Sequence, residues 1–581
     1  MHIQPDYHKA WINRGSAAKK STSRGPFLAN LSLIAKQNPE LNKRGYEGAL
    51  VSFRQGLKYV HKNTQPESWG VLHQNIGIAH YDHWKYRQRE NAQYWKDAIN
   101  EYNKAYKTLK DFPERHLDLL QGFIRAYLDF GTRQKRVEAE KFKKEAWNIF
   151  QDLLEKQIND NQKSLFSLKY AWLGQLTVDI NLQKGELIKA WEIAEREKNA
   201  CLTWLLSGWA TEIDSPSYKK IQKVLTPSTA IIYWHISPNS LNTFILKHEL
   251  EAPIVKQDLG RSKDQLKEWV KNWNREYEEQ NTSWQNNLSE NLQELKDILQ
   301  IDAIVEELTS ITNLILIPHQ ELHLLPLNFL FPYDFTITYL PCAQLALNPT
   351  KTKFSLTKDD KIFSLECPAN LDFAEMESEI ICQIFSHSNR ISGEKATEET
   401  VKTELSQPHE LFHFTGHGYY DFNSPKDSAL QLIDEEKLTL EKILQIPLPE
   451  KSYKIVTLSA CETALTGTQS ITTEYVGLVS GFMRWGTAYV LSTQWIVEDA
   501  PNALVIIQFY RLLLEDNSIT PPLALAKATQ WLRELTFEEL KNYYHGLQTE
   551  FPDMKDEIHG LLRHQRNIVL MRKQSGEKTI C

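Results

Sequence analysis

The sequence predicts a two-part protein, an all-α helical repeat region followed by an α/β domain with a mainly parallel central sheet. Three observations predict this fold class. Residues 27–210 contain few glycines or prolines and place apolar residues at helical spacing. The first β-branched and aromatic runs follow directly after this region. From residue 311 onward, such runs alternate with helical segments, as in domains whose parallel sheet is covered by helices.

The length and composition are those of a folded protein with several domains. At 581 residues the chain exceeds one ordinary hydrophobic core. Hydrophobic residues make up 41% and charged residues 24%, both ordinary values for soluble proteins. The formal net charge of −7 does not indicate a nucleic-acid-binding surface. No apolar run reaches the roughly 18 residues that span a bilayer, so we expect no membrane partner.

The N-terminus and the cysteines both predict a cytoplasmic protein. Residues 1–26 are polar and basic, lack the apolar centre of a signal peptide, and are expected to form a flexible arm. The cysteines form no C-x-x-C pair and no framework spacing, so they indicate neither a zinc site nor a disulfide scaffold. We expect reduced thiols. The six cysteines are Cys201, Cys342, Cys367, Cys382, Cys461 and Cys581.

Residues 27–215 are predicted to form helical repeats. A small-aromatic-small pattern recurs at offsets 0, 4 and 7, which fall on one helix face and let a neighbouring helix approach closely. This pattern resembles tetratricopeptide repeats, but its copies start nearly 50 residues apart instead of about 34, so the helices or loops must be longer. A plain amphipathic bundle stays open as the alternative. The copies are Ala49/Phe53/Gly56, Ala98/Tyr102/Ala105 and, more loosely, Ala146/Phe150/Leu153.

The α/β part begins within residues 210–225, where the pattern changes to strands. Two β-branched and aromatic runs parted by "PNS" (238–240) predict a hairpin. Further strands are predicted at 313–319, 361–366, 410–415, 453–459 and 487–493. Helices are predicted at 375–386, 397–405, 473–485, 500–515 and 521–535. In parallel sheets of this kind, reactive groups lie at the C-terminal ends of the strands.

Two of the predicted strands end in reactive residues. The strand at 410–415 runs into Gly416-His417-Gly418, and the strand at 453–459 runs into Ala460-Cys461. If these strands are neighbours, an imidazole and a thiol meet at one rim of the sheet, which is the minimum for thiol nucleophilic catalysis. Each residue alone has a plainer interpretation, a packing histidine and an inert cysteine. Their joint occurrence, 44 residues apart, favours the catalytic interpretation.

Four ordered motifs resemble the CHAT family, cysteine proteases related to caspases and separases (clan CD) and often fused to tetratricopeptide repeats. The resemblance covers roughly residues 215–540 and implies a caspase-like fold, with residues 216–350 as a degenerate half and 351–581 as the active half. It implies no cofactor and no metal. The motifs are "LILIPHQELHLLPLNFL" (314–330), "FHFTGHG" (412–418), "VTLSACETALTG" (456–467) and "GLVSGFMRWGTAYVLSTQWIVEDA" (477–500).

The resemblance implies a role for each residue of the site. Cys461 would be the nucleophile and His417 the general base, with the backbone N–H groups of Gly418 and Cys461 holding the oxyanion. Ser459, two residues before the cysteine, would help to form the primary substrate pocket together with Trp495 and Asp499. Because Ser459 is neutral, we expect a neutral or apolar residue in that pocket, unless Asp499 or Asp427 faces it. His413 is expected to turn to the opposite face of its strand in a structural role.

The implied function is that of a cysteine endopeptidase that cleaves a specific protein substrate. We expect the helical repeats to hold it inactive until they sense a regulatory protein or ribonucleoprotein, in a bacterial immune pathway of the CRISPR or gasdermin kind. A non-enzymatic helical-repeat adaptor with a retired protease fold is the main alternative. A hydrolase or acyltransferase for small substrates is another. A metal site made of His413, His417 and Cys461 is the least favoured.

Overall fold

The computed structural model divides the chain into two compact units. The first comprises residues 1–194 and 236–241, and the second comprises residues 195–235 and 242–581. The predicted boundaries of the arm, the repeats and the two α/β halves stay predictions. The structure describes residues 8–20, 38–208, 210–258, 261–278, 287–347, 354–367, 371, 373–419, 421, 424–447, 452–460, 477–493, 499–555 and 558–559.

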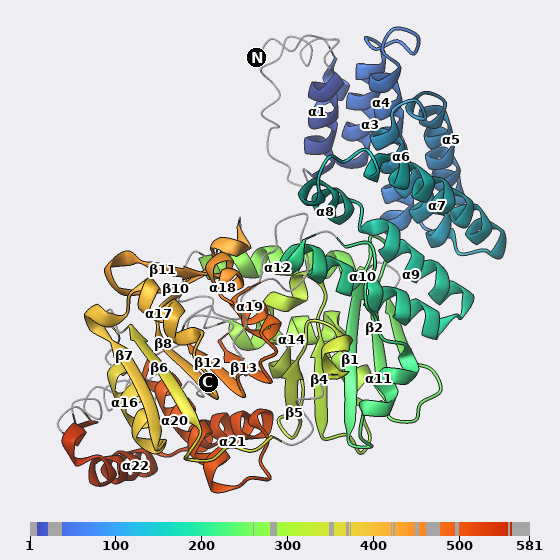
Figure 1. The fold of residues 1–581 in the computed structure, drawn as a ribbon. Coiled ribbons are helices and arrows are strands. Elements are labelled where there is room, and N and C mark those ends of the chain that lie inside the picture. Colours follow the sequence, from blue (N-terminus) through green and yellow to red (C-terminus); the bar gives the residue numbers. More distant parts are fainter. Residues whose placement is uncertain are drawn as a thin grey trace. The chain divides into compact units, whose positions relative to one another are not determined.

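The first unit is helical, as predicted, and α1 to α7 pack mainly against their neighbours in the sequence, whereas α9 packs against α6 and α7 (Figure 1). This nearest-neighbour packing is typical of repeat architectures, in which each helix pair buries its apolar face against the next. The helices are α1 (His8–Lys20), η2 (Pro39–Asn42), α3 (Gly45–Leu57), α4 (Pro66–Arg87), α5 (Ala92–Leu109), α6 (Pro113–Phe130), α7 (Arg133–Leu154), α8 (Asp160–Lys169), α9 (Trp172–Lys184) and α10 (Leu187–Ser207), whose second part belongs to the other unit.

Small residues set the distance between α4 and α5. Ala98, Tyr102 and Ala105 form one buried face of α5, as the small-aromatic-small pattern predicts. Opposite them on α4, a Cβ atom at Gly77 would lie 2.4 Å from the Tyr102 ring. The ring therefore packs directly on the α4 backbone, which only glycine permits. The assignment of these helices to the tetratricopeptide family stays a prediction.

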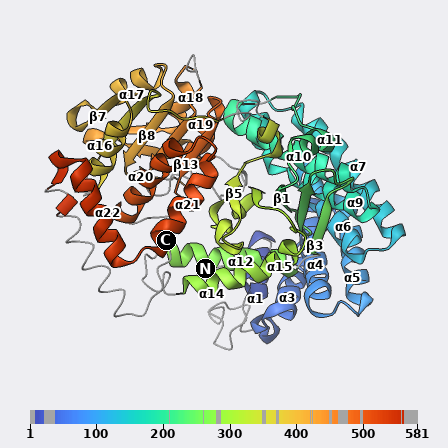
Figure 2. The same cartoon turned by 90° about the horizontal axis from the view of Figure 1, so that it is seen from below.

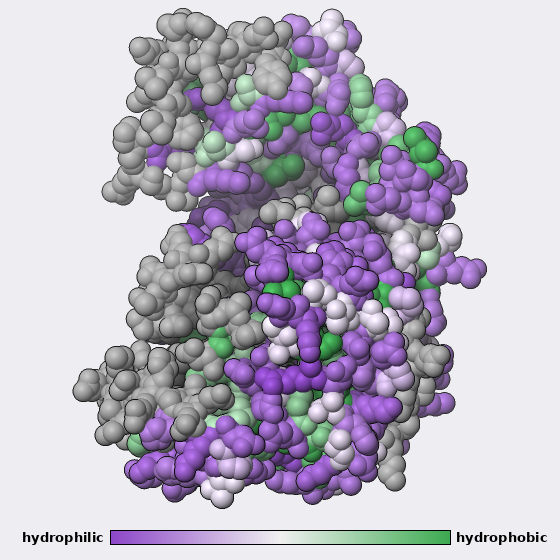
Figure 3. Space-filling model, turned by 60° about the vertical axis from the view of Figure 1, so that its left-hand side comes forward, coloured by the Kyte–Doolittle hydropathy of each residue, from purple (hydrophilic) through white to green (hydrophobic). Residues whose placement is uncertain are grey.

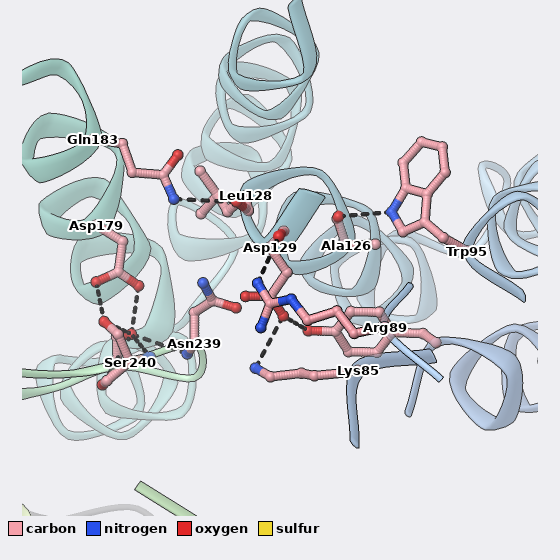
Figure 4. Close-up of polar contacts among 12 residues, drawn as sticks. Lys85, Arg89, Trp95, Ala126, Leu128, Asp129, Asp179, Gln183, Asn239 and Ser240 are labelled. Carbon is pink, nitrogen blue, oxygen red and sulfur yellow. Dashed lines mark hydrogen bonds and ion pairs between the residues drawn. The ribbon is translucent and has the colours of Figure 1, made fainter. Parts of the chain in front are cut away.

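Buried carboxylates lie among the helices of this unit (Figure 4). Lys85 of α4 lies 2.9 Å from the Asp129 carboxylate of α6, with side-chain exposures of 3% and 0%. The Tyr81 hydroxyl also donates to Asp129. The turn at residues 236–241 is part of the same unit, and its Ser240 hydroxyl donates to Asp179 of α9 at 2.7 Å. Each carboxylate is thus compensated by donors, as burial requires.

Replacement of Lys85 by alanine should lower the free energy of unfolding of the helical unit by about 3 kcal/mol, because the buried Asp129 would lose the cation that lies 2.9 Å from its carboxylate. Lys169→Ala is the matched control, since the Lys169–Glu114 pair has the same kind of contact but exposures of 49% and 60%. There we expect less than about 1 kcal/mol. Urea unfolding followed by circular dichroism measures both. Equal effects of the two substitutions would contradict this account.

In the described residues of the second unit, the strands form two five-stranded sheets and one small sheet. The first five-stranded sheet has the order β3-β2-β1-β4-β5, with β1 parallel to β4 and β4 parallel to β5. The predicted hairpin is confirmed as β1 (Thr229–Ile236) and β2 (Leu241–Lys247). The other elements of this part are α11 (Tyr218–Val224), β3 (Ile254–Asp258), α12 (Arg261–Glu278), α14 (Leu288–Ile298), α15 (Ile301–Val305), β4 (Asn313–Ile317), η3 (Gln320–Leu324), η4 (Leu327–Leu330), β5 (Thr336–Tyr339) and η5 (Ala343–Leu347).

The second five-stranded sheet has the order β13-β12-β8-β6-β7, and all its neighbouring strands are parallel, as predicted. Helices α17, α18 and α19 supply the core on one face, and helices α16, α20 and α21 cover the other (Figure 2). The elements are β6 (Lys361–Cys367), α16 (Ala374–Ile384), β7 (His387–Ser392), α17 (Glu398–Leu405), β8 (Leu411–Gly416), α18 (Leu440–Gln445), β12 (Ile455–Ser459), α19 (Leu478–Arg484), β13 (Tyr489–Ser492), α20 (Asp499–Glu515), α21 (Pro521–Glu534) and α22 (Phe537–Glu550).

The small antiparallel sheet directly follows β8. It consists of β9 (Gly418–Tyr419), β10 (Ala429–Gln431) and β11 (Lys437–Thr439), in the order β11-β10-β9. The five predicted strands at 313–319, 361–366, 410–415, 453–459 and 487–493 are all confirmed, as are the helices near 375, 397, 500 and 521. The predicted helix at 473–485 is confirmed from Leu478, and its residues 473–476 lie outside the described residues.

None of the helices in the described part of the chain combines the length and the hydrophobicity that a bilayer crossing requires. Figure 3 shows one face of the molecule, on which the coloured residues are mostly hydrophilic and the hydrophobic ones form small separate areas.

Candidate active site

The two strands that lead into the predicted reactive residues are neighbours. Strands β8 and β12 pair in parallel from Leu411↔Ile455 to Thr415↔Ser459, at the centre of the sheet. His417 lies two residues beyond Thr415, and Cys461 lies two residues beyond Ser459. The two motifs therefore leave the sheet at the same edge and in register. Cys461 itself lies outside the described residues.

The end of β8 approaches β6 too closely for a side chain at residue 416. A Cβ atom on Gly416 would lie 2.8 Å from the Cys367 carbonyl oxygen and 2.9 Å from the Phe414 ring. The carbonyl belongs to the paired strand, in which Cys367 is the partner of Gly416, so it has no room to move. The first glycine of the "GHG" motif therefore serves packing at the sheet edge.

The small sheet holds the backbone around His417. The Gln431 N–H donates to the His417 carbonyl at 2.9 Å, and Gly418 faces Leu430 across the β9–β10 pair. This pattern makes Gly418 and Leu430 a non-hydrogen-bonded pair, so the Gly418 N–H points away from β10. The N–H predicted to hold an oxyanion is thus not used by this strand pair. The His417 side chain is half-buried.

Two side chains that the sequence did not single out fix the backbone before Cys461. Asn502 of α20 donates from its Nδ2 to the Ser459 hydroxyl at 2.7 Å, and Ser459 is only 4% exposed. The Thr493 hydroxyl, just past β13, donates to the Ala460 carbonyl. Both contacts join segments more than thirty residues apart in the sequence, so no local pattern could have revealed them.

The remaining predicted pocket residues lie in different environments. Asp499 begins α20, and its carboxylate accepts a hydrogen bond from the Phe373 N–H at 2.8 Å, which ties the start of α20 to the start of α16. A carboxylate at this position is also favourable for the helix dipole. Asp427 is exposed in a short 3-10 helix. Trp495 lies outside the described residues.

The His413 side chain is buried on the face of the sheet that α16 and α20 cover. Its Nε2 atom lies 3.2 Å from the Glu377 carboxylate of α16, and both side chains are at most 1% exposed. Its ring also packs edge-to-face against Tyr510 of α20, with 6.0 Å between ring centres. This environment agrees with the structural role expected for His413. In the part of the chain that the structure describes, no three His, Cys, Asp or Glu side chains are placed to bind a metal ion.

With this geometry established, the comparisons with known proteins identify the domain. Residues 289–546 match the model of the CHAT domain family. The chain carries a CHAT domain. The match spans β4 and the whole parallel sheet β13-β12-β8-β6-β7, including both predicted reactive segments.

A chain in the crystal structure of the Saccharomyces cerevisiae separase–securin complex is similar over 85% of this chain, with 13% sequence identity and a TM-score of 0.46. The present chain spans 44% of that chain. The comparison with curated proteins found no match.

The described cysteines of the CHAT domain are poor nucleophiles. Burial and the neighbouring Glu366 raise the pKa of Cys367 to about 12, and burial raises the pKa of Cys382 to about 11. Burial also holds the pKa of Cys342 well above its usual range. Since the thiolate is the reactive form, these three thiols are inert near neutral pH.

Alkylation with iodoacetamide at pH 7.5 should leave Cys367 and Cys382 unlabelled in the folded protein. Their raised pKa values keep them protonated until the pH approaches 11, and both are 8% exposed. Unfolding in urea returns each pKa to roughly 8.5 and should make both reactive. Mass spectrometry of the labelled peptides measures the difference. Rapid labelling of Cys367 in the folded protein would contradict its assignment as a structural thiol.

Gly416→Ala should destabilise the CHAT domain by about 1–3 kcal/mol, because the added methyl group meets a backbone oxygen that cannot yield. Gly546→Ala in α22 is the matched control, since a Cβ atom there meets nothing within 4 Å. In a helix interior that substitution should stabilise by up to about 1 kcal/mol. Thermal unfolding measures both changes in stability, which should have opposite signs. If Gly416→Ala left the stability unchanged, the edge of the sheet would not be tightly packed.

Proposed function

We propose that the chain is a cysteine endopeptidase in which Cys461 is the nucleophile and His417 the general base. The observation that carries the proposal is the parallel register of β8 and β12, which directs both motifs to one edge of the sheet. The inert character of Cys342, Cys367 and Cys382 supports Cys461 as the reactive thiol. The family match is consistent with such an activity.

In the first step, His417 accepts the thiol proton and the Cys461 sulfur attacks the carbonyl carbon of the scissile peptide bond. Negative charge then develops on the carbonyl oxygen. The backbone N–H groups of Gly418 and Cys461 would hold that oxyanion, and preorganised donors of this kind are worth the most where the charge appears only in the transition state. The outward direction of the Gly418 N–H supports its role.

In the second step, the tetrahedral intermediate collapses and the peptide C–N bond breaks. His417 gives its proton to the leaving amine, and the acyl group remains on Cys461 as a thioester. Water then enters, His417 accepts one of its protons, and the hydroxide attacks the thioester carbonyl. The acid product leaves, and the proton returns to the cysteine sulfur, so the enzyme is regenerated without any cofactor.

For the substrate pocket we propose a preference for a neutral or apolar side chain. Ser459 carries no charge, and its hydroxyl already accepts a hydrogen bond from Asn502. The Asp499 carboxylate is engaged by the Phe373 N–H. Ser459 therefore supplies no carboxylate for a basic side chain, and the Asp499 carboxylate is directed to the start of α16. Profiling with a peptide library tests this, and a strong preference for arginine or lysine next to the cleaved bond would overturn it.

We further propose that the helical unit regulates the peptidase. Stacked helix pairs provide extended binding surfaces rather than reactive groups, which suits recognition of a regulatory protein or ribonucleoprotein. The resemblance to CHAT proteases with repeats supports a role in a bacterial immune pathway in the cytoplasm. In this proposal the partner's binding to the repeats releases cleavage of a specific protein substrate.

The decisive experiment is incubation of wild type, Cys461→Ala and His417→Ala with the proteins encoded beside this chain. Wild type should cleave one of them, Cys461→Ala should not, and His417→Ala should be slower by about 10²–10⁴-fold because the general base is lost. Cys382→Ala serves as the control, since that thiol lies on α16 and is inert. Cleavage by Cys461→Ala at the wild-type rate would overturn the proposal in favour of another nucleophile.

A further inference from the structure

The two units of the chain carry formal charges of opposite sign. The first unit contains 31 lysines and arginines against 21 aspartates and glutamates, a net charge of +10. The second unit contains 36 against 53, a net charge of −17. Such an asymmetry between two parts of one chain favours an anionic partner for the basic part. The total of −7 conceals this property of the helical unit.

Helices α5 and α7 each expose one stripe of mainly lysine and asparagine side chains. In both stripes the residues follow offsets of 0, 4, 7 and 11, so each stripe lies on a single helix face. That face is opposite the residues that α5 and α7 bury against their neighbours. The stripes consist of Lys96, Asn100, Asn103 and Lys107 on α5, and of Val137, Lys141, Lys144 and Asn148 on α7.

The two stripes lie on the same side of the helical unit. Helices α5 and α7 run in the same direction, because α6 returns antiparallel between them through two short loops (Figure 1). They face each other through Tyr106, whose hydroxyl donates to Glu145 at 2.7 Å. The α5 stripe lies about a quarter of a turn from Tyr106, and the α7 stripe lies about a quarter of a turn from Glu145 in the opposite sense. For two parallel helices, opposite rotations from the facing residues bring both stripes to one side.

Helix α3 adds two cations to this side. It runs parallel to α5 with α4 between them, and its Tyr46 contacts Tyr94 of α5 edge-to-face, with 5.9 Å between ring centres. Arg54 in the last turn of α3 and Lys58 directly after the helix are exposed. Both lie about a quarter of a turn from Tyr46, in the same sense as the α5 stripe from Tyr106. The basic face is defined here as Arg54, Lys58, Lys96, Lys107, Lys141 and Lys144.

The cations of the basic face are not neutralised by carboxylates. Within the described part of the chain none of the six forms an ion pair, whereas all three lysines of α8 and α9 do. The acidic Glu47 of α3 already lies 3.4 Å from Lys43. The exposed Asp152 and Glu155 mark the C-terminal limit of the face on α7. The positive potential of the basic face is therefore open to an external anion.

The composition of the two stripes favours a nucleic acid over a protein. Protein–protein contacts are anchored by aromatic and aliphatic side chains, and lysine is depleted in them. Val137 is the only apolar residue of the two stripes. Lysine and asparagine are instead among the side chains that bind the phosphate oxygens of nucleic acids. With no aromatic ring on which an unpaired base could stack, the basic face suits the regularly spaced phosphates of a double helix.

We propose that the basic face binds the phosphate backbone of a nucleic-acid duplex without reading its sequence. From Lys96 to Lys107 the α5 stripe spans roughly 16 Å, which matches about five nucleotides of one strand. Three helices side by side, with roughly 8–10 Å between neighbouring axes, widen the face across the backbone. The asparagines of the stripes would donate further hydrogen bonds to phosphate oxygens. The proposal concerns the helical unit and does not rest on the proposed peptidase activity.

Fluorescence anisotropy of the full chain tests the proposal, with a DNA duplex, an RNA duplex of the same sequence and the single DNA strand as labelled probes. At about 50 mM salt we expect both duplexes to bind with Kd values on the order of 1–100 μM, and the single strand to bind more weakly. With six phosphate contacts, the logarithm of the association constant should fall with the logarithm of the salt concentration at a slope of about −5. A second DNA duplex of unrelated sequence should bind equally well.

The quadruple variant K96Q/K107Q/K141Q/K144Q should weaken binding of the duplexes at least about tenfold and reduce the salt slope to about −2. The matched control is K163Q/K169Q/K184Q/K189Q, which removes the same charge from α8, α9 and α10, where each of the four lysines already pairs with a carboxylate. It should bind as wild type does, and circular dichroism checks that both variants fold. Equal losses in the two variants, or no binding of either duplex by wild type, would overturn the proposal. Tighter binding of poly-glutamate than of both duplexes would overturn it in favour of an acidic protein partner.

Discussion

The parallel register of β8 and β12 is the constraint on which the rest of the CHAT domain depends. Both faces of β8 are buried, with Phe412 and Phe414 in the core under α17–α19 and Leu411 in the core under α16 and α20. A slip of one residue would exchange the two sets and place the wrong side chains in each core. The register is therefore fixed by packing, and with it the position at which each motif leaves the sheet.

Buried polar groups reinforce this register on the side of α16 and α20. Beside the His413–Glu377 contact, the Thr457 and Tyr510 hydroxyls lie 2.7 Å apart, and the Ser364 and Ser378 hydroxyls lie 3.0 Å apart. Each pair joins a different strand of the sheet to a helix. A shifted strand would leave the hydroxyl groups of the Thr457–Tyr510 and Ser364–Ser378 pairs without partners in a place that water cannot reach, which is more costly than loss of an apolar contact.

The sequence predicted the strands whose two faces are both buried, and it did not predict strands that are partly exposed. The strands at the centre of the sheet are continuous apolar runs, because helices cover both their faces. Strand β7 was not predicted because it is an edge strand with polar residues. One of them, Arg390, forms ion pairs with Glu366 of β6 and Glu379 of α16. Helices α12 and α14 were not predicted either, although the buried residues of α12, namely Leu266, Trp269, Val270 and Trp273, recur at helical spacing.

The sequence also predicted only some of the residues around the candidate site. His417, Gly418 and Cys461 were predicted because their motifs follow directly on recognisable strands. Asn502 and Thr493 were not, because their contacts with Ser459 and the Ala460 carbonyl exist only once the chain has folded. Glu377 was missed in the same way.

Several polar groups at the strand ends are committed to structure, which constrains where reactivity can reside. Ser459 is engaged by Asn502, Asp499 by the Phe373 backbone, and the Ala460 carbonyl by Thr493. Such contacts hold the sheet edge rigid, and catalytic groups need rigid supports to keep productive distances. The groups that a substrate could engage are then those carried just past the strand ends. This division of roles explains why short segments directly after rigid strands suit the proposed dyad.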